Sequence, residues 1–356
     1  MDDGVTSARA LADRVRYSGD MLRRKTAGDE TATIRARNMF FHNGLQISPS
    51  VTPNLANRLT LVCDRLQIPQ DSVHAFIYAS PEIQAECFAG TTSFCVLRFS
   101  SALVDLLNDD EFEFVAGHEL GHFLLDHGIV RLENQDENLE FQIQERAQEI
   151  SADRIGLISC QSLEVAIQSL MKTVSGLSRE HLRFDIGAFL SQLRNVREEV
   201  GEGSHFATHP SILIRCRALL WFSLNDLFTR KFDQSSVELL EQLDQRILKD
   251  MDRFIDAPSR IIIDDARENL SIWVAASHAV ADGVFDKNEQ TVFADMFGIS
   301  ILERLKSFLS DLPASEVEEA VFDRMKSARE DLEQIIPSGF NQVYAEIQEQ
   351  VKTRFV

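Results

Sequence analysis

The sequence predicts an α+β fold, with a small β-sheet early in the chain, helices after it, and then an all-α domain. Three observations predict it. Residues 72–79 and 93–99 are β-branched or aromatic runs bounded by Ser, Pro and Gly, which is typical of strands. From residue 108 onward, apolar residues recur at spacings of three and four, which is typical of helices. A length of 356 residues is enough for two domains.

The elements before the helical part follow in a clear order. Residues 1–50 predict a helical lead-in, and residues 53–69 predict a helix that stops at a proline. Residues 80–92 can hold a third short strand between the two clear ones. We therefore expect three parts along the chain: a helical lead-in at 1–50, a first domain at 51–230 and a helical domain at 231–356.

Two long helices follow the predicted strands. Asn108 and Asp109 open the first, which runs to about His127 with Gly128 as its C-cap. Residues 138–160 predict the second, because their apolar residues keep the helical spacing.

Composition and charge exclude several classes of protein. A formal net charge of −20 argues against nucleic acid or anionic lipid as the main partner, because both require a basic surface. No apolar window of 18 residues predicts a membrane span, and the first residues lack the pattern of a signal peptide. The five scattered cysteines form no CxxC pair, so we expect reduced core thiols in a cytoplasmic protein: Cys63, Cys87, Cys95, Cys160 and Cys216.

The first long helix carries the stretch HELGH at residues 118–122. A spacing of four turns an α-helix by about 400°, so His118 and His122 share one face, one turn apart. Two imidazoles placed so can chelate one zinc ion, and Glu119 can reach a water on that ion without competing as a ligand. Composition predicts about 0.04 chance matches to His-acid-x-x-His in this chain, so the pattern favours a catalytic metal helix.

A catalytic zinc needs a third protein ligand. The metzincin arrangement would place Gly and His three and six residues after His122, but Leu125 and Gly128 stand there. His127 is at the wrong spacing, and we expect it to cap the helix or pack.

A glutamate from a second helix is the other common third ligand of a catalytic zinc ion. In the stretch EISADRIG, Glu149 and Asp153 are spaced by four and share one helix face. We favour Glu149 as the ligand, with Glu145 and Glu140 as rivals. Asp153 could accept a hydrogen bond from His118 and fix its tautomer. A solvated helix face is the structural alternative for this pair.

Three ordered motifs, HELGH, EISAD and THPSILIRCRAL, resemble the pattern HExxH, ExxAD and HPxxxxR of the HtpX and CAAX prenyl protease family of gluzincin zinc metallopeptidases. The resemblance covers about residues 50–225. It implies a gluzincin-type metallopeptidase domain with a small β-sheet beside the HExxH helix. The family's Asn-Ala-Phe turn is QAECFAG here. The sequence lacks the membrane helices of the best-known members, so their membrane-protein substrates do not carry over.

The resemblance implies a zinc endopeptidase with one zinc ion per chain on His118, His122 and Glu149. Glu119 would act as general base toward water and then as acid toward the leaving amine. The substrate would be a protein or peptide.

The resemblance also implies residues that contact the reacting substrate. His209 would donate to the oxyanion, with Arg215 as an orienting or substrate-contacting partner. A loop histidine before a helix is the structural alternative for His209, and His205 is the weaker candidate. We expect the strand at 93–99 to form the sheet edge beside the cleft, where a peptide could add as a strand. Its candidate residues are Phe94, Cys95, Val96 and Leu97.

The C-terminal stretch AVADGVFDKNE resembles the TerB-like helical domain linked to tellurite-resistance proteins, over about residues 255–355. Asp286 and Glu289 predict a capping box at the start of a helix, which we favour over a divalent-cation site at Asp282, Asp286 and Glu289. Such a domain could bind a regulatory protein partner.

Three functions compete. The first is a cytoplasmic zinc endopeptidase, and the second is a catalytically silent or latent zinc-binding interaction protein. The third is a zinc hydrolase acting on a non-peptide amide. An intact Glu119 favours catalysis, because a structural metal site has no use for a base beside the metal, and the adjacent strand favours peptides.

Overall fold

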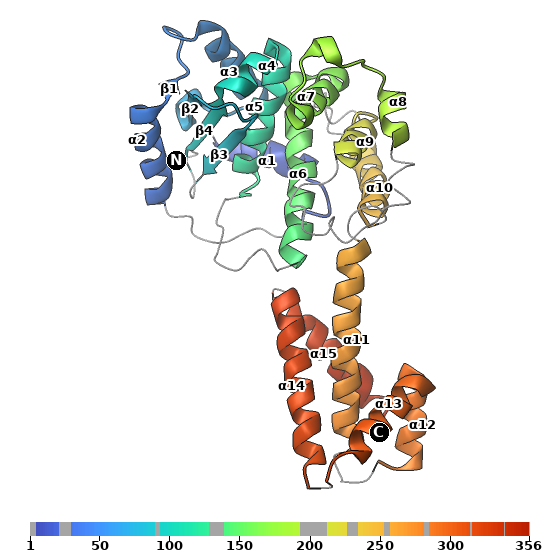
Figure 1. Cartoon of the computed structure of the whole chain (residues 1–356). Helices are drawn as coiled ribbons and strands as arrows, with labels where there is room; N and C mark the ends of the chain where they lie inside the picture. The colour runs from blue at the N-terminus through green and yellow to red at the C-terminus, as the bar shows by residue number, and fades with distance from the viewer. Residues whose placement is uncertain are drawn as a thin grey trace. The chain divides into compact units, whose positions relative to one another are not determined.

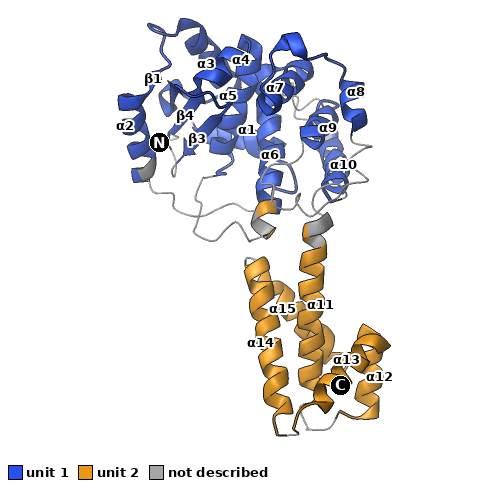
Figure 2. Cartoon of the chain, in the orientation of Figure 1, with its two compact units in different colours: residues 1–132, 143–255 blue, residues 133–142, 256–356 orange. Residues whose placement is uncertain are grey.

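The computed structural model describes residues 5–20, 30–89, 93–127, 139–192, 212–225, 234–252, 257–280, 285–313, 315–337 and 339–355. The chain divides into two compact units, coloured separately in Figure 2: residues 1–132 and 143–255, and residues 133–142 and 256–356. Most described residues are helical, and the first unit holds one small mixed sheet, which is compatible with the predicted α+β class. The predicted domain boundaries after residues 50 and 230 remain predictions.

The sheet of the first unit has the strand order β1-β2-β4-β3 (Figure 1), with β1 at Leu45–Gln46, β2 at Val73–Tyr78, β3 at Ala85–Ala89 and β4 at Cys95–Ser100. β2 and β4 run parallel, and β1 and β3 pair antiparallel on the two outer sides. Side chains alternate along β4. Leu97 and Phe99 enter the main core, whereas Val96 packs against Phe40 of α2 (Glu30–Asn43) on the other face.

The prediction that residues 94–97 form the sheet edge is wrong. β4 pairs with β2 on one side and β3 on the other, so its backbone is not free to accept a peptide strand. The side chains of Cys95, Val96 and Leu97 are fully buried. The edge on this side is β3, the strand that the sequence predicted only as a short third one, and β3 lies against the HELGH helix.

The HELGH helix is α5 (Asp109–Leu124), and its start is fixed as the sequence predicts. Asn108 and Glu111 form a capping box, in which Asn108 Oδ1 accepts from Glu111 N at 2.9 Å and Glu111 Oε2 accepts from Asn108 N at 2.8 Å. Lys172 of α7 (Leu163–Ser175) also donates to Glu111 at 2.7 Å. The helix ends at Leu124, earlier than predicted, and Asp126 takes a left-handed backbone with φ 56°. Gly128, the predicted C-cap, lies outside the described residues.

The second long helix, α6 (Leu139–Cys160), packs closely against α5 because glycines line the contact. A Cβ at Gly117 would overlap the side chain of Ser159, and a Cβ at Gly121 would lie 3.0 Å from Ala152 Cα. This approach brings Glu149 and Asp153, in the middle of α6, within reach of the imidazoles on α5.

The other helices of the first unit surround this pair. They are α1 (Val5–Val15), α3 (Pro53–Leu66), α4 (Ser101–Leu106), α8 (Ile186–Ser191), α9 (Ile212–Phe222) and α10 (Gln234–Met251), with 3₁₀ turns at Gln70–Ser72 and Arg179–His181. Arg58 and Arg65 of α3 hold the buried carboxylate of Glu113 on α5 at 2.7 and 2.6 Å. All five cysteines are free and buried, as predicted.

The second unit has its own apolar core, built around Leu270, Phe293 and Leu332. Its described elements are the helices α11 (Ala257–Ala279), α12 (Lys287–Phe297), α13 (Ile299–Ser310), α14 (Val317–Ile335) and α15 (Phe340–Lys352). Asp286 and Glu289 form the predicted capping box at the start of α12, and Asp282 lies outside the described residues. In the part of the chain that is described, no helix is long and apolar enough to cross a membrane.

Candidate metal centre

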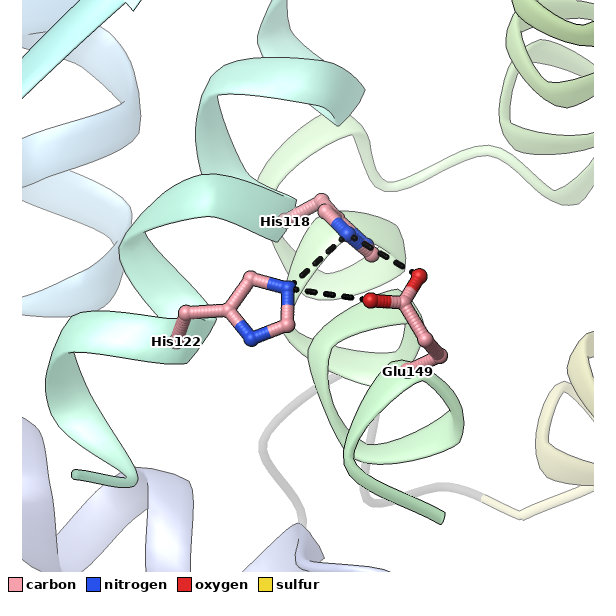
Figure 3. Close-up of side chains that lie close together, drawn as sticks. All are labelled: His118, His122 and Glu149. Atoms are coloured by element: carbon pink, nitrogen blue, oxygen red, sulfur yellow. Dashed lines mark hydrogen bonds and ion pairs between the residues drawn. The ribbon is translucent and has the colours of Figure 1, made fainter. Parts of the chain in front are cut away.

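Two imidazoles of α5 and one carboxylate of α6 converge in the first unit (Figure 3). His118 Nε2 and His122 Nε2 lie 3.2 Å apart. Glu149 places Oε2 at 3.6 Å from His118 Nε2 and Oε1 at 3.5 Å from His122 Nε2. Among the described residues this is the group of three that could hold a metal ion, and Glu145 is not part of it. The side chain of Glu140, the other rival, is outside what the structure describes.

Asp153 and Arg215 hold the first of these imidazoles. Asp153 Oδ1 lies 3.0 Å from His118 Nδ1, and Arg215 of α9 donates to Asp153 at 2.8 and 2.6 Å. Burial would raise the pKa of Asp153, but the Arg215 guanidinium and the His118 ring together outweigh burial and lower it. The carboxylate is therefore ionised and can only accept, so the hydrogen of this contact is on His118 Nδ1, and Nε2 is the ring nitrogen that can bind a metal ion.

The second imidazole has a different partner. His122 Nδ1 lies 3.0 Å from His127 Nδ1, and His127 Nε2 lies 2.9 Å from Asp20 Oδ2. The side chains of His127 and Asp20 are 1% and 0% exposed. Burial lowers the pKa of His127 to about 4, so this ring is neutral near pH 7. The contact with His122 therefore joins one N–H donor to one ring acceptor.

The geometry of the three ligand groups fits a small metal ion. Lone pairs of two imidazoles and a carboxylate meet at one point, which requires a positive charge there, either a proton or a metal ion. Burial would lower the pKa of His122, but the hydrogen bond and charge of Glu149 outweigh it and raise the pKa, which favours a positive charge at this point. Ligand atoms of a tetrahedral ion with metal–nitrogen bonds of 2.0–2.1 Å lie about 3.3 Å apart. The observed separations of 3.2, 3.5 and 3.6 Å are close to this value.

Glu119 lies beside this centre and outside its ligand group. It follows His118 on α5 and is 9% exposed. Burial raises the pKa of Glu119, the two imidazoles lower it, and the carboxylates of Glu149 and Glu86 raise it further. No hydrogen bond within the described ranges involves the Glu119 carboxylate. Its oxygens are therefore available to a water or substrate.

Three further site residues were predicted from the sequence: His205, His209 and Arg215. His209 and His205 lie outside the described residues. Arg215 was predicted to orient or contact substrate, but its guanidinium is turned toward Asp153 and Glu149, 3.0 Å from the latter. The α9 helix presents Arg215 to two buried carboxylates, so its charge is already satisfied within the protein.

Two residues of the site were missed by sequence reasoning. His127 was expected to cap or pack, because it does not have the spacing of a metal ligand. One signal was its position five residues after His122, because a chain that turns at the end of a helix can bring such a residue back against His122. Asp20 carried no local signal, since it lies 107 residues before its partner His127.

Comparison with known proteins places the metal centre in context. Residues 49–143 match the model of Peptidase family M48, and this segment contains the sheet strands β2 to β4 and the HELGH helix but ends before Glu149. No curated protein and no solved structure matches the chain. Peptidases of this family require a metal ion and act on proteins. The match and the cluster of His118, His122 and Glu149 support a metallopeptidase domain of the M48 family in this chain.

Proposed function

We propose that the protein is a zinc-dependent endopeptidase that binds one zinc ion per chain on His118, His122 and Glu149. The observation that carries this proposal is the convergence of these three groups beside a carboxylate, Glu119, that is not a ligand. Two imidazoles and one carboxylate leave a fourth position open, which is the composition of a catalytic rather than a structural zinc site. When bound, the ion would polarise a water molecule and the scissile carbonyl.

Glu119 is proposed as the proton carrier of the reaction. Its carboxylate would take a proton from the attacking water and give it to the leaving amine. Burial raises the pKa of Glu119, which supports both roles, because a carboxyl with a higher pKa is a stronger base and holds the proton more readily before transfer. By the resemblance to the HtpX and CAAX prenyl protease family, His209 would donate a hydrogen bond to the oxyanion.

The substrate is proposed to lie along β3 (Ala85–Ala89). This strand is the edge of the sheet, and it lies against α5, which carries both imidazoles and Glu119. An extended peptide could add to this edge through backbone hydrogen bonds, with its scissile bond near Glu119. This proposal replaces the predicted edge at residues 94–97 and favours peptides over other amides.

Cleavage of an unfolded protein tests the proposed function. Zinc-loaded protein should cut casein at internal bonds, a chelator should abolish the cleavage, and added zinc should restore it while added magnesium should not. The products are identified by mass spectrometry. Stoichiometric zinc binding without cleavage of casein or of a mixed peptide library would instead establish the alternative, a silent zinc-binding interaction protein.

A further inference from the structure

We propose that His127 and Asp20 are positioning residues for the zinc ligand His122. The hydrogen-bonded chain from Asp20 through His127 to His122 is called the Asp20 relay below. In this account the relay fixes the tautomer and the rotation of the His122 ring, so that its Nε2 lone pair points at the metal position. The inference rests on the proposed function, because it concerns a ligand of the proposed zinc ion.

The direction of every hydrogen bond in the Asp20 relay follows from the Asp20 carboxylate, which can only accept. Asp20 accepts from Gln144 Nε2 at 2.8 Å and from Arg16 NH1 at 3.3 Å, so its carboxylate is an acceptor among donors. His127 Nε2 must then carry the hydrogen of the 2.9 Å contact with Asp20. This leaves a lone pair on His127 Nδ1, which accepts the Nδ1 hydrogen of His122. His122 Nε2 is left with its lone pair, as a metal ligand requires.

The turn after α5 places His127 for this task. The left-handed residue Asp126, with φ 56°, reverses the chain, and His127 N donates to His122 O at 2.9 Å. The two rings meet nearly edge to face, with centroids 5.1 Å apart. A backbone bond and a side-chain bond therefore join the same two residues, which restricts the rotation of the His122 ring.

The two histidine ligands are thus held by separate parts of the chain. Asp153 and Arg215 hold His118 from α6 and α9, whereas the Asp20 relay holds His122 from the segment after α1. Asp20 lies before the segment that matches the M48 family model. The predicted lead-in at residues 1–50 therefore contributes Asp20 to the hydrogen bonds that support the metal centre.

The affinity of the metal-free protein for Zn²⁺ tests the Asp20 relay. His127→Phe keeps a ring of similar size but removes both nitrogens, and we expect zinc to bind roughly 10–100-fold more weakly, the usual loss when a partner of a metal ligand is removed. His127→Asn offers an amide oxygen near the Nδ1 position, so it should recover most of the affinity. Competition with a chromophoric chelator measures the zinc affinity of both variants, and thermal unfolding without metal shows that each variant is folded.

His181→Phe is the matched control. It makes the same substitution at an exposed histidine in the 3₁₀ turn at Arg179–His181, which is not part of the Asp20 relay. The variant should bind zinc as tightly as the wild type. If His127→Phe also binds zinc as tightly as the wild type, the proposed role of the Asp20 relay is wrong. If the wild type binds no zinc, the proposed function fails, and the relay fails with it.

A spectroscopic measurement covers the case in which His127→Phe does not fold. Long-range ¹H–¹⁵N spectra of the zinc-loaded wild type, labelled at histidine, distinguish the two neutral tautomers of each ring. We expect His127 as the Nε2–H tautomer and His122 as the Nδ1–H tautomer. Observation of His127 as the Nδ1–H tautomer would overturn the inference, because its Nδ1 could then not accept from His122.

Discussion

Replacing Glu119 by glutamine is expected to reduce peptide hydrolysis by about 10²–10⁴-fold, while zinc binding and the fold are kept. The amide has nearly the shape of the carboxylate but cannot take a proton from water or return one to the leaving amine. Glu119 is not among the groups that converge on the metal position, so the metal should stay bound. The ratio kcat/KM should fall mainly through kcat, because the lost interaction belongs to the transition state.

A matched substitution on the same helix controls for this test. Asp110→Asn also replaces a carboxylate of α5 by an amide, but the Asp110 side chain is 60% exposed and pairs only with Arg58 at the surface. Its cleavage rate should equal that of the wild type. Cleavage of casein by Glu119→Gln at the wild-type rate, with equal zinc content, would remove Glu119 from the role of proton carrier.

Replacing Arg215 by methionine is expected to lower the free energy of unfolding of the metal-free protein by about 3–5 kcal/mol. The Arg215 guanidinium pairs with Asp153 and Glu149, whose side chains are 1% and 9% exposed. Burial would lower the pKa of Arg215, but the two carboxylates outweigh it and raise the pKa. Without this cation, two neighbouring buried carboxylates lose the positive charge that they share, which costs far more than the loss of one surface contact.

Arg217→Met on the same helix is the control for Arg215. Arg217 pairs with Asp250 at 2.7 Å, but its side chain is 37% exposed, so its loss should cost at most about 1 kcal/mol. Urea denaturation followed by circular dichroism measures both variants against the wild type. Equal losses of stability in the two variants would contradict the assignment of Arg215 to the buried pair of carboxylates.

Local chemistry explains what the sequence could predict. The spacing of four between His118 and His122, and between Glu149 and Asp153, sets two helix faces without knowledge of the fold. The capping box at Asn108 is equally local, because it involves residues only three positions apart. These features were predictable since the helix itself fixes the geometry between the residues concerned.

The features that were mispredicted or missed depend on distant parts of the chain. The edge of the sheet depends on whether residues 85–89 pair with β4, and strand pairing is not encoded within either strand. Asp20 reaches His127 across 107 positions, and Arg215 reaches Asp153 across 62. The oxyanion role of His209, the TerB-like domain and its regulatory partner remain predictions.

Elemental analysis of the purified protein, with wild type and His122→Ala prepared in parallel, measures directly whether the chain binds zinc on the proposed ligands. The variant removes one imidazole from the centre but leaves His118, Glu149 and the capping of α5 in place. We expect one zinc ion per chain in the wild type and a large loss of zinc in the variant, with circular dichroism spectra of both showing the same helical content. Equal zinc content in the two proteins would rule out His122 as a zinc ligand.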